Sequence, residues 1–182
     1  MRILFFPLFL VAAACAARPP IAPMPAGGPA RVDATGADMV VAIDAGAEPS
    51  PRTLPAPPDG AWPALQAAYG ELGLTIGAAD AQTHVLASGR VAISRRWDSA
   101  AASAYFDCGR TKSGEPAADA YRVLLTVRSV LAPAEAGSSE LRTFVDAAAR
   151  SPEGTSASAV RCASTGRLEE RIAERARRLL GK

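Results

Sequence analysis

The side chains with the most chemical potential in this chain are three cysteines and one histidine, namely Cys15, Cys108, Cys162 and His84. A single histidine supports neither a multi-histidine metal site nor, without further partners, a His-based triad. The sequence also lacks the H-E-x-x-H, G-x-S-x-G, Walker and S-x-x-K motifs. His84 follows a threonine and precedes a valine, as expected of a surface or strand-end residue. We predict no catalytic residue, no cofactor and no metal, and therefore a non-enzymatic protein.

Cys108 and Cys162 support two interpretations. In the segment Y-F-D-C-G-R, Asp107 and Arg110 flank Cys108 and would suit a reactive thiolate nucleophile. An exported chain, however, folds where disulfides persist, and each cysteine stands beside glycine or small polar residues. We predict a structural Cys108–Cys162 disulfide, with two buried thiols as the alternative.

Cys15 closes the apolar leader M-R-I-L-F-F-P-L-F-L-V-A-A-A-C. Arg2 is the positive start, and Ala12 to Ala14 form the small-residue exit. A cysteine after three small residues resembles a bacterial lipobox, although Ala12 stands where that signal carries leucine. The apolar run of about 14 residues is shorter than the roughly 20 that cross a bilayer.

Residues 1–14 are therefore expected to be a signal peptide, and Cys15 to be lipidated and to anchor the chain to a membrane. This predicts an exported protein on the periplasmic face of the outer membrane. An ordinary cleaved secretory leader is the alternative, which would give a soluble periplasmic or secreted protein.

Composition divides the rest of the chain in two. Residues 15–30 are rich in proline, alanine and glycine and have no apolar period, which is typical of a flexible tether. Residues 31–182 are long enough for one domain with its own core. The whole chain has a net charge of +2. A balance so close to neutral argues against nucleic acid as a partner.

The first elements expected are a strand at 38–44, a proline-rich connection and a helix at 61–73. Proline lacks the amide donor, which excludes a long helix or central strand from the connection. Asp59 is the expected N-cap of the helix, Pro63 stands in its first turn, and Gly73 stops it. Its apolar stripe consists of Trp62, Leu65, Tyr69 and Leu72.

Period-two patterns then predict strands at 83–88, 91–97, 103–108 and 120–133, followed by a return strand at 140–150. For the return strand a helix is a competitor, because residues 147–149 are alanines. Residues 167–180 predict a helix with the stripe Leu168, Ile172, Ala176 and Leu179. Thr165 or Gly166 would cap it, with Glu169 reaching back, and Glu174 would pair with Arg178.

A sheet with one polar face and two helices with apolar stripes predicts that both helices cover the same face. The expected fold class is therefore α+β: a two-layer sandwich of an antiparallel sheet with two helices on one face, of the helix-grip or TATA-box-binding-protein-like kind.

Two basic segments leave their roles open. Arg95, Arg96 and Trp97 form either an anion-binding or cation–π corner, or a strand end with Trp97 in the core. The arginines of the last helix either touch anionic lipid headgroups or form a solvated face, since glutamates alternate with them. They are Arg171, Arg175, Arg177 and Arg178.

Three motifs suggest relatives: C-x-S-T-G-x-L-E from Cys162 to Glu169, D-C-G from Asp107 to Gly109, and W-x-x-L-x-x-x-Y-x-x-L-G from Trp62 to Gly73. With these, residues 38–180 resemble a group of uncharacterised bacterial secreted proteins and lipoproteins, and the resemblance implies no activity. The element order also resembles the helix-grip domains of the outer-membrane assembly lipoprotein BamC, in topology only.

The sequence thus favours a non-catalytic envelope lipoprotein that serves as an accessory or protein-interaction module with an envelope protein partner. The alternative is a carrier of a small hydrophobic ligand or lipid, held in a cavity between helix and sheet.

Overall fold

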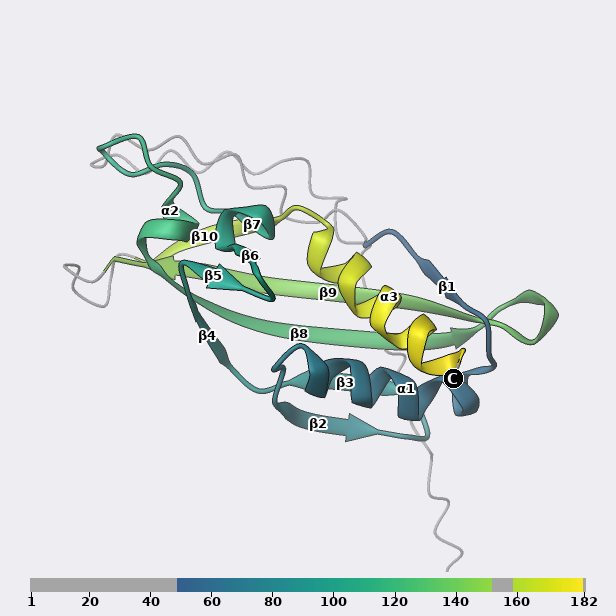
Figure 1. Cartoon of the computed structure of the whole chain (residues 1–182). Helices are drawn as coiled ribbons and strands as arrows, with labels where there is room; N and C mark the ends of the chain where they lie inside the picture. Colours follow the sequence, from purple (N-terminus) through teal and green to yellow (C-terminus); the bar gives the residue numbers. More distant parts are fainter. Residues whose placement is uncertain (1–48, 152–158, 182) are drawn as a thin grey trace, which may run out of the picture.

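The structure is a computed structural model that describes residues 49–151 and 159–181. Its elements are β1 (Arg52–Leu54), α1 (Pro58–Glu71), β2 (Ile76–Asp80), β3 (Val85–Ser88), β4 (Val91–Ser94), β5 (Arg96–Trp97), β6 (Ala100–Ala101), η1 (Ala102–Ala104), β7 (Phe106–Asp107), α2 (Ala117–Ala120), β8 (Arg122–Pro133), η2 (Glu135–Gly137), β9 (Ser139–Arg150), β10 (Ala159–Ser164) and α3 (Arg167–Leu180). Figure 1 shows α1 and α3 on the same side of the sheet. The predicted two-layer α+β sandwich is confirmed. The strand expected at 38–44 lies outside the described residues.

The sheet is built around the long hairpin of β8 and β9, which pair in register from Arg122 opposite Arg150 to Pro133 opposite Ser139. β3 and β4 both pair with the other edge of β8. β9 pairs on its second edge with β1 near one end and β10 near the other. The return strand is therefore a strand, and the competing helix is wrong, because β9 gains pairing partners on both edges.

Alternation along β8 separates the core from an open face. Val123, Leu125 and Val127 are at most 1 % exposed and lie beneath the helices. Arg122 and Arg128 are exposed on the opposite face. The predicted polar face is thus confirmed, and none of the described helices covers it (Figure 1).

Helix α1 begins one turn earlier than expected. Its N-cap is Pro57, and the amide of Ala61 donates to the Pro57 carbonyl oxygen at 2.9 Å. Asp59 as N-cap was wrong, because a proline at the first helical position is already set for helix entry. Pro63 consequently lies inside the helix and not in its first turn. The apolar stripe is confirmed, since its four residues are at most 9 % exposed.

Helix α3 has the predicted bounds. Its N-cap is Gly166 at φ +82°, without a capping side chain. Glu169 reaches back to accept a hydrogen bond from the Ser164 hydroxyl at 2.9 Å and not from the N-cap amide. Leu168 and Ile172 are fully buried. These side chains dock α3 on the sheet beside α1.

The segment predicted as a strand at 103–108 is mostly not one. The 3₁₀ turn η1 occupies Ala102–Ala104, and only Phe106–Asp107 pairs, as β7 with β10. The proline-rich connection likewise contains a short strand, β1, which pairs with the end of β9. Short edge pairings of this kind leave almost no periodic signal in a sequence.

Buried side chains of both helices and of the sheet meet in the core. One continuous cluster joins residues of both helices to the sheet, and its largest fully buried members include Leu65, Tyr69, Leu125, Leu141, Leu168 and Ile172. The Tyr69 hydroxyl donates to Ser129 Oγ at 2.9 Å, and Ser129 Oγ lies 2.9 Å from Thr143 Oγ1. Burial raises the pKa of Tyr69 far above its usual range, so the phenol remains a neutral donor inside the core.

Candidate functional site: the arginine groove

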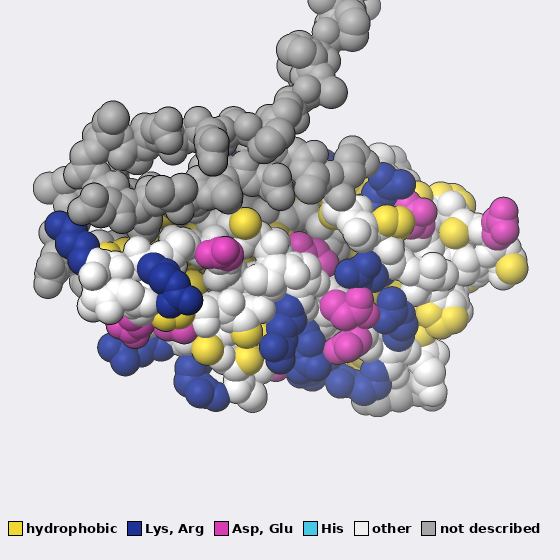
Figure 2. Space-filling model, turned by 90° about the horizontal axis from the view of Figure 1, so that it is seen from above, with side chains coloured by type: hydrophobic (Ala, Val, Ile, Leu, Met, Phe, Trp, Pro, Cys, Tyr) yellow, Lys and Arg dark blue, Asp and Glu magenta, His cyan; other side chains and the backbone are white. Residues whose placement is uncertain are grey.

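Four of the arginines of α3 pair with carboxylates, and the fifth, Arg167, lies over the Tyr105 ring. Arg171 Nη2 lies 2.7 Å from Asp98 Oδ2, and Arg175 bridges Asp98 and Glu71 at 3.1 and 3.2 Å. Arg178 also pairs with Glu71. Asp98 and, after it, Glu174 raise the pKa of Arg171 by hydrogen bonding to the guanidinium. Figure 2 shows such a mixed region, with acidic side chains set directly among basic ones.

This ion pairing bears on two expectations, the Glu174–Arg178 pair and the contact of the α3 arginines with lipid headgroups. The predicted Glu174–Arg178 pair is wrong: Glu174 pairs with Arg171 at 3.1 Å, and Arg178 reaches across to α1. Arg177 pairs with Glu170 at 3.1 Å. The charge of the helix face is therefore used internally, to fasten α3 to α1 and to the β5–β6 turn.

The open face of the sheet differs in its charge balance. At one end of β8 and β9 its charged and aromatic side chains are partnered: Arg142 Nε lies 2.5 Å from Glu140, and the Arg128 guanidinium lies 4.6 Å from the centre of the Phe144 ring. At the other end of these strands, the arginines have no carboxylate partner among the described residues. Arg90, Arg95, Arg122 and Arg150, which we call the arginine groove, form no ion pair with a carboxylate within residues 49–151 and 159–181.

The pairing register concentrates this charge. Arg122 stands directly opposite Arg150, and Ser94 stands opposite Arg122 on the next strand. Like charges on directly opposed residues of neighbouring strands destabilise a sheet. Arg95, the one residue between β4 and β5, has φ +58°, a left-handed conformation that is uncommon for a long side chain. Both features are unfavourable for stability, and the backbone of Arg95 is held by a hydrogen bond that its carbonyl accepts from the amide of Ala102 at 2.8 Å.

Two pockets on this surface share Arg150. The larger, about 530 Å³, is lined by Arg95, Arg122 and Arg150 together with Ser94 and Tyr121, and none of the lining residues that the structure describes is a carboxylate. The smaller, about 180 Å³, is lined by Arg90, Arg150 and a strip of the open sheet face that includes Asp146. Asp146 itself lies 3.8 Å from Arg161. The groove can therefore bind a compact anion by charge-assisted hydrogen bonds.

His84 occupies the strand-end position expected of it, immediately before β3 and at φ +51°. Its Nε2 atom lies 2.9 Å from Asp59 Oδ1, and its ring meets the edge of Trp62 at 5.7 Å. Within the described residues Asp59 is the only side chain hydrogen-bonded to the imidazole. The pair links the start of β3 to the first turn of α1.

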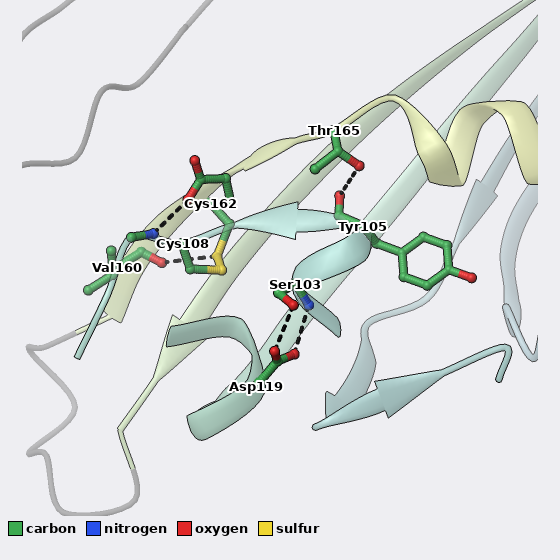
Figure 3. The surroundings of a disulfide bond; sticks show 9 residues. Ser103, Tyr105, Cys108, Asp119, Val160, Cys162 and Thr165 are labelled. Atoms are coloured by element: carbon green, nitrogen blue, oxygen red, sulfur yellow. Dashed lines mark hydrogen bonds between the residues drawn. A yellow bond between two sulfur atoms is a disulfide. The ribbon is translucent and has the colours of Figure 1, made fainter. Parts of the chain in front are cut away.

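Cys108 and Cys162 are joined in a disulfide (Figure 3), with sulfur atoms 2.08 Å apart. The nucleophile interpretation of Cys108 is therefore wrong, because the sulfur carries no thiol. Its proposed helpers are also engaged elsewhere: Asp107 accepts from the amide of Gly109, and Arg110 donates to the Gly114 carbonyl.

Further contacts hold the disulfide region against α3. Thr165 Oγ1 donates to the Ala104 carbonyl at 2.8 Å, and the Thr165 amide donates to the Tyr105 carbonyl at 3.0 Å. Asp119 of α2 accepts from both the amide and the hydroxyl of Ser103 (Figure 3). The disulfide thus belongs to the support of the fold, at the junction of β10 and α3.

The R-R-W segment divides between its two interpretations. Trp97 packs against the core, as expected of a strand end, whereas Arg95 lines the pocket, as expected of an anion contact. The Trp97 ring is half-buried beside Tyr105 and Phe106, and its indole nitrogen donates to the Leu72 carbonyl at 3.0 Å. Arg96 donates to the Ser99 carbonyl. Arg95 alone turns into the groove.

Cys15 lies outside the described residues, as does the tether. Within residues 49–151 and 159–181, no helix is long and apolar enough to cross a membrane, and no cluster of three or more potential metal ligands occurs. No protein-family model matches the chain, and no curated protein matches it.

The groove is the feature that the sequence did not reveal as a site. Alternation placed Arg122 on the polar face, and Arg95 was recognised as a candidate anion contact. Their meeting with Arg150 depends on the hairpin register, which the sequence pattern does not set. One signal could have found it: Arg122 stands at the start of one long strand and Arg150 at the end of the next, so an antiparallel hairpin would bring them together.

Proposed function

We propose that this protein is a non-catalytic, lipid-anchored accessory module of the bacterial cell envelope, which binds an anionic partner through the arginine groove. Cys15 after its apolar leader supplies the anchor, and the proposed location is the periplasmic face of the outer membrane. Two acyl chains suffice for stable membrane attachment.

The observation that carries the proposal is the contrast between the two layers. Four arginines on α3 pair with carboxylates, whereas Arg95, Arg122 and Arg150 line one pocket whose described lining residues include no carboxylate. Stability alone would favour a neutral or acidic residue opposite Arg122. A row of unneutralised arginines matches an external anion by charge complementarity.

The continuous core cluster between helices and sheet supports a binding module over the hydrophobic-ligand carrier. A carrier needs space between helix and sheet, but there Leu65, Tyr69 and Ile172 are 0 % exposed and belong to one continuous cluster.

Site-specific photo-crosslinking tests the binding surface. Ala92 is an exposed alanine on the open face, opposite Leu124 of β8, and Ala67 is an exposed alanine on α1. A crosslinker at position 92 should give an adduct of defined mass in living cells, and one at position 67 should not. The adduct should vanish when Arg122→Gln and Arg150→Gln are added. An adduct that persists in that variant, or that forms equally from position 67, would reject the groove as the binding surface.

The anchor is tested separately. Metabolic labelling with a palmitate analogue should mark the wild-type protein and leave Cys15→Ser unlabelled. A wild-type protein that is unlabelled and fully soluble would rule out the anchor.

A further inference from the structure

We infer that the larger pocket of the arginine groove is a binding site for a phosphomonoester. This inference rests on the proposed function, because it names the ligand class of the same groove. It commits to a phosphate group and not to the acidic surface of a protein.

The number of guanidinium groups in one pocket supports this choice. Arg95, Arg122 and Arg150 come from the end of β4 and from β8 and β9, and all three line the same concavity. A single carboxylate brings one negative charge and two oxygens, which leaves most of that positive charge uncompensated. A phosphomonoester carries about −1.5 to −2 charges near neutral pH and three acceptor oxygens.

The donor chemistry agrees. Each guanidinium presents five N–H donors in a planar fork that suits bidentate contacts to phosphate. Ser94 and Tyr121 are also among the lining residues. The pocket volume of about 530 Å³ also leaves room for the group that bears the phosphate, since a single water takes up only about 30 Å³ of liquid.

The concave shape argues against an acidic protein surface. Arg128, on the same strand and face but outside the pocket, already stacks on Phe144. Arg161 pairs with Asp146. Among the arginines of β8, β9 and β10 that the structure describes, only Arg122 and Arg150 thus have no side-chain partner, and both line the pocket.

The pocket predicts effects of opposite sign on stability and on binding. Arg122→Gln removes the like-charge pair with Arg150, so the ligand-free protein should melt at a higher temperature than the parent. The same variant should bind inorganic phosphate roughly ten-fold more weakly or worse, because one charge-assisted contact is lost. A variant that merely folds poorly cannot show both effects.

The test uses the exported full chain with Cys15→Ser, which keeps the protein off membranes, and isothermal titration with inorganic phosphate. Ionic strength is held constant with sodium chloride, and acetate serves as the carboxylate comparison. Phosphate should bind the parent chain, bind Arg128→Gln equally well, and bind Arg122→Gln and Arg150→Gln weakly.

Three results would overturn the inference: no phosphate binding to the parent chain, equal binding of acetate or of an acidic peptide, or equal loss in Arg128→Gln. A crosslink from position 92 without phosphate binding would reject the phosphate ligand and leave the proposed binding surface in place. Phosphate binding without such a crosslink would support the pocket as a phosphate site and reject the groove as the surface that binds an envelope partner.

A vesicle arm distinguishes the two sources of a phosphomonoester. Vesicles containing phosphatidic acid, whose headgroup is a phosphomonoester, should sediment the protein if the ligand is a lipid, and inorganic phosphate should compete. Phosphate binding with no such sedimentation assigns a soluble phosphate ester. Either result supports the pocket.

Discussion

Replacing Ile172 with alanine probes the two-layer arrangement most directly. Ile172 lies in the middle of α3, is 0 % exposed and belongs to the cluster that joins both helices to the sheet. The substitution removes three carbon groups, and at about 0.8 kcal/mol for each buried group the transfer term alone is about 2.4 kcal/mol. The cavity left between α3 and the sheet brings the expected loss to about 2–5 kcal/mol.

The assay is urea unfolding followed by circular dichroism, with thermal melts in parallel. For a domain of this size the loss corresponds to a melting temperature lower by roughly 5–15 °C. Leu180→Ala is the matched control, since Leu180 lies on the same helix but is only partly buried, and it should cost clearly less. An unchanged midpoint for Ile172→Ala would mean that α3 does not dock as described, and the reasoning about the covered face would fail with it.

Three other predictions follow from the same contacts. In the Cys15→Ser chain, alkylation without reductant should find no free thiol, and two alkylatable thiols would reject the disulfide. Replacing both Cys108 and Cys162 with serine should lower the free energy of unfolding by up to about 4 kcal/mol, because the disulfide spans 54 residues. Asp98→Asn should lower the free energy of unfolding by about 1 kcal/mol, because Arg171 and Arg175 lose a charged partner at the partly exposed β5–β6 turn. Amide hydrogen exchange at residues 96–101 should become faster. Unaltered exchange there would contradict the role given to this ion pair. Tyr69→Phe should lower the free energy of unfolding by about 1–2 kcal/mol. In a double-mutant cycle, Tyr69→Phe combined with Ser129→Ala should lower it by less than the sum of the two single substitutions. Strict additivity would mean that the hydroxyl contact contributes no energy.

The parts of the fold that the sequence predicted are those governed by a repeating pattern. The stripe from Leu168 to Leu179 located α3, and the alternation from Val123 to Val127 located β8 and its covered face. The Cys108–Cys162 disulfide followed from counting cysteines in a chain expected to be exported. Each of these signals is local or depends on composition alone.

The parts that it missed depend on contacts between distant segments. The β5–β6 turn places Asp98 and Ser99 at positive φ, and arginines more than seventy residues later hold it. Glu71 was not recognised as the partner of Arg178, because their pairing requires α1 and α3 to lie side by side. The arginine groove is of the same kind, since only the register of β9 on β8 brings Arg150 to Arg122.

The two ends of β9 separate the first described strand from the arginine groove. β1, the first described strand, pairs with β9 at Leu141, whereas the groove lies at Arg150, nine residues along the same strand. At about 3.3 Å per residue this separation is about 30 Å. A ligand bound in the groove would therefore lie at the opposite end of β9 from the edge that β1 occupies, and the contacts of β1 with β9 would stay clear of it.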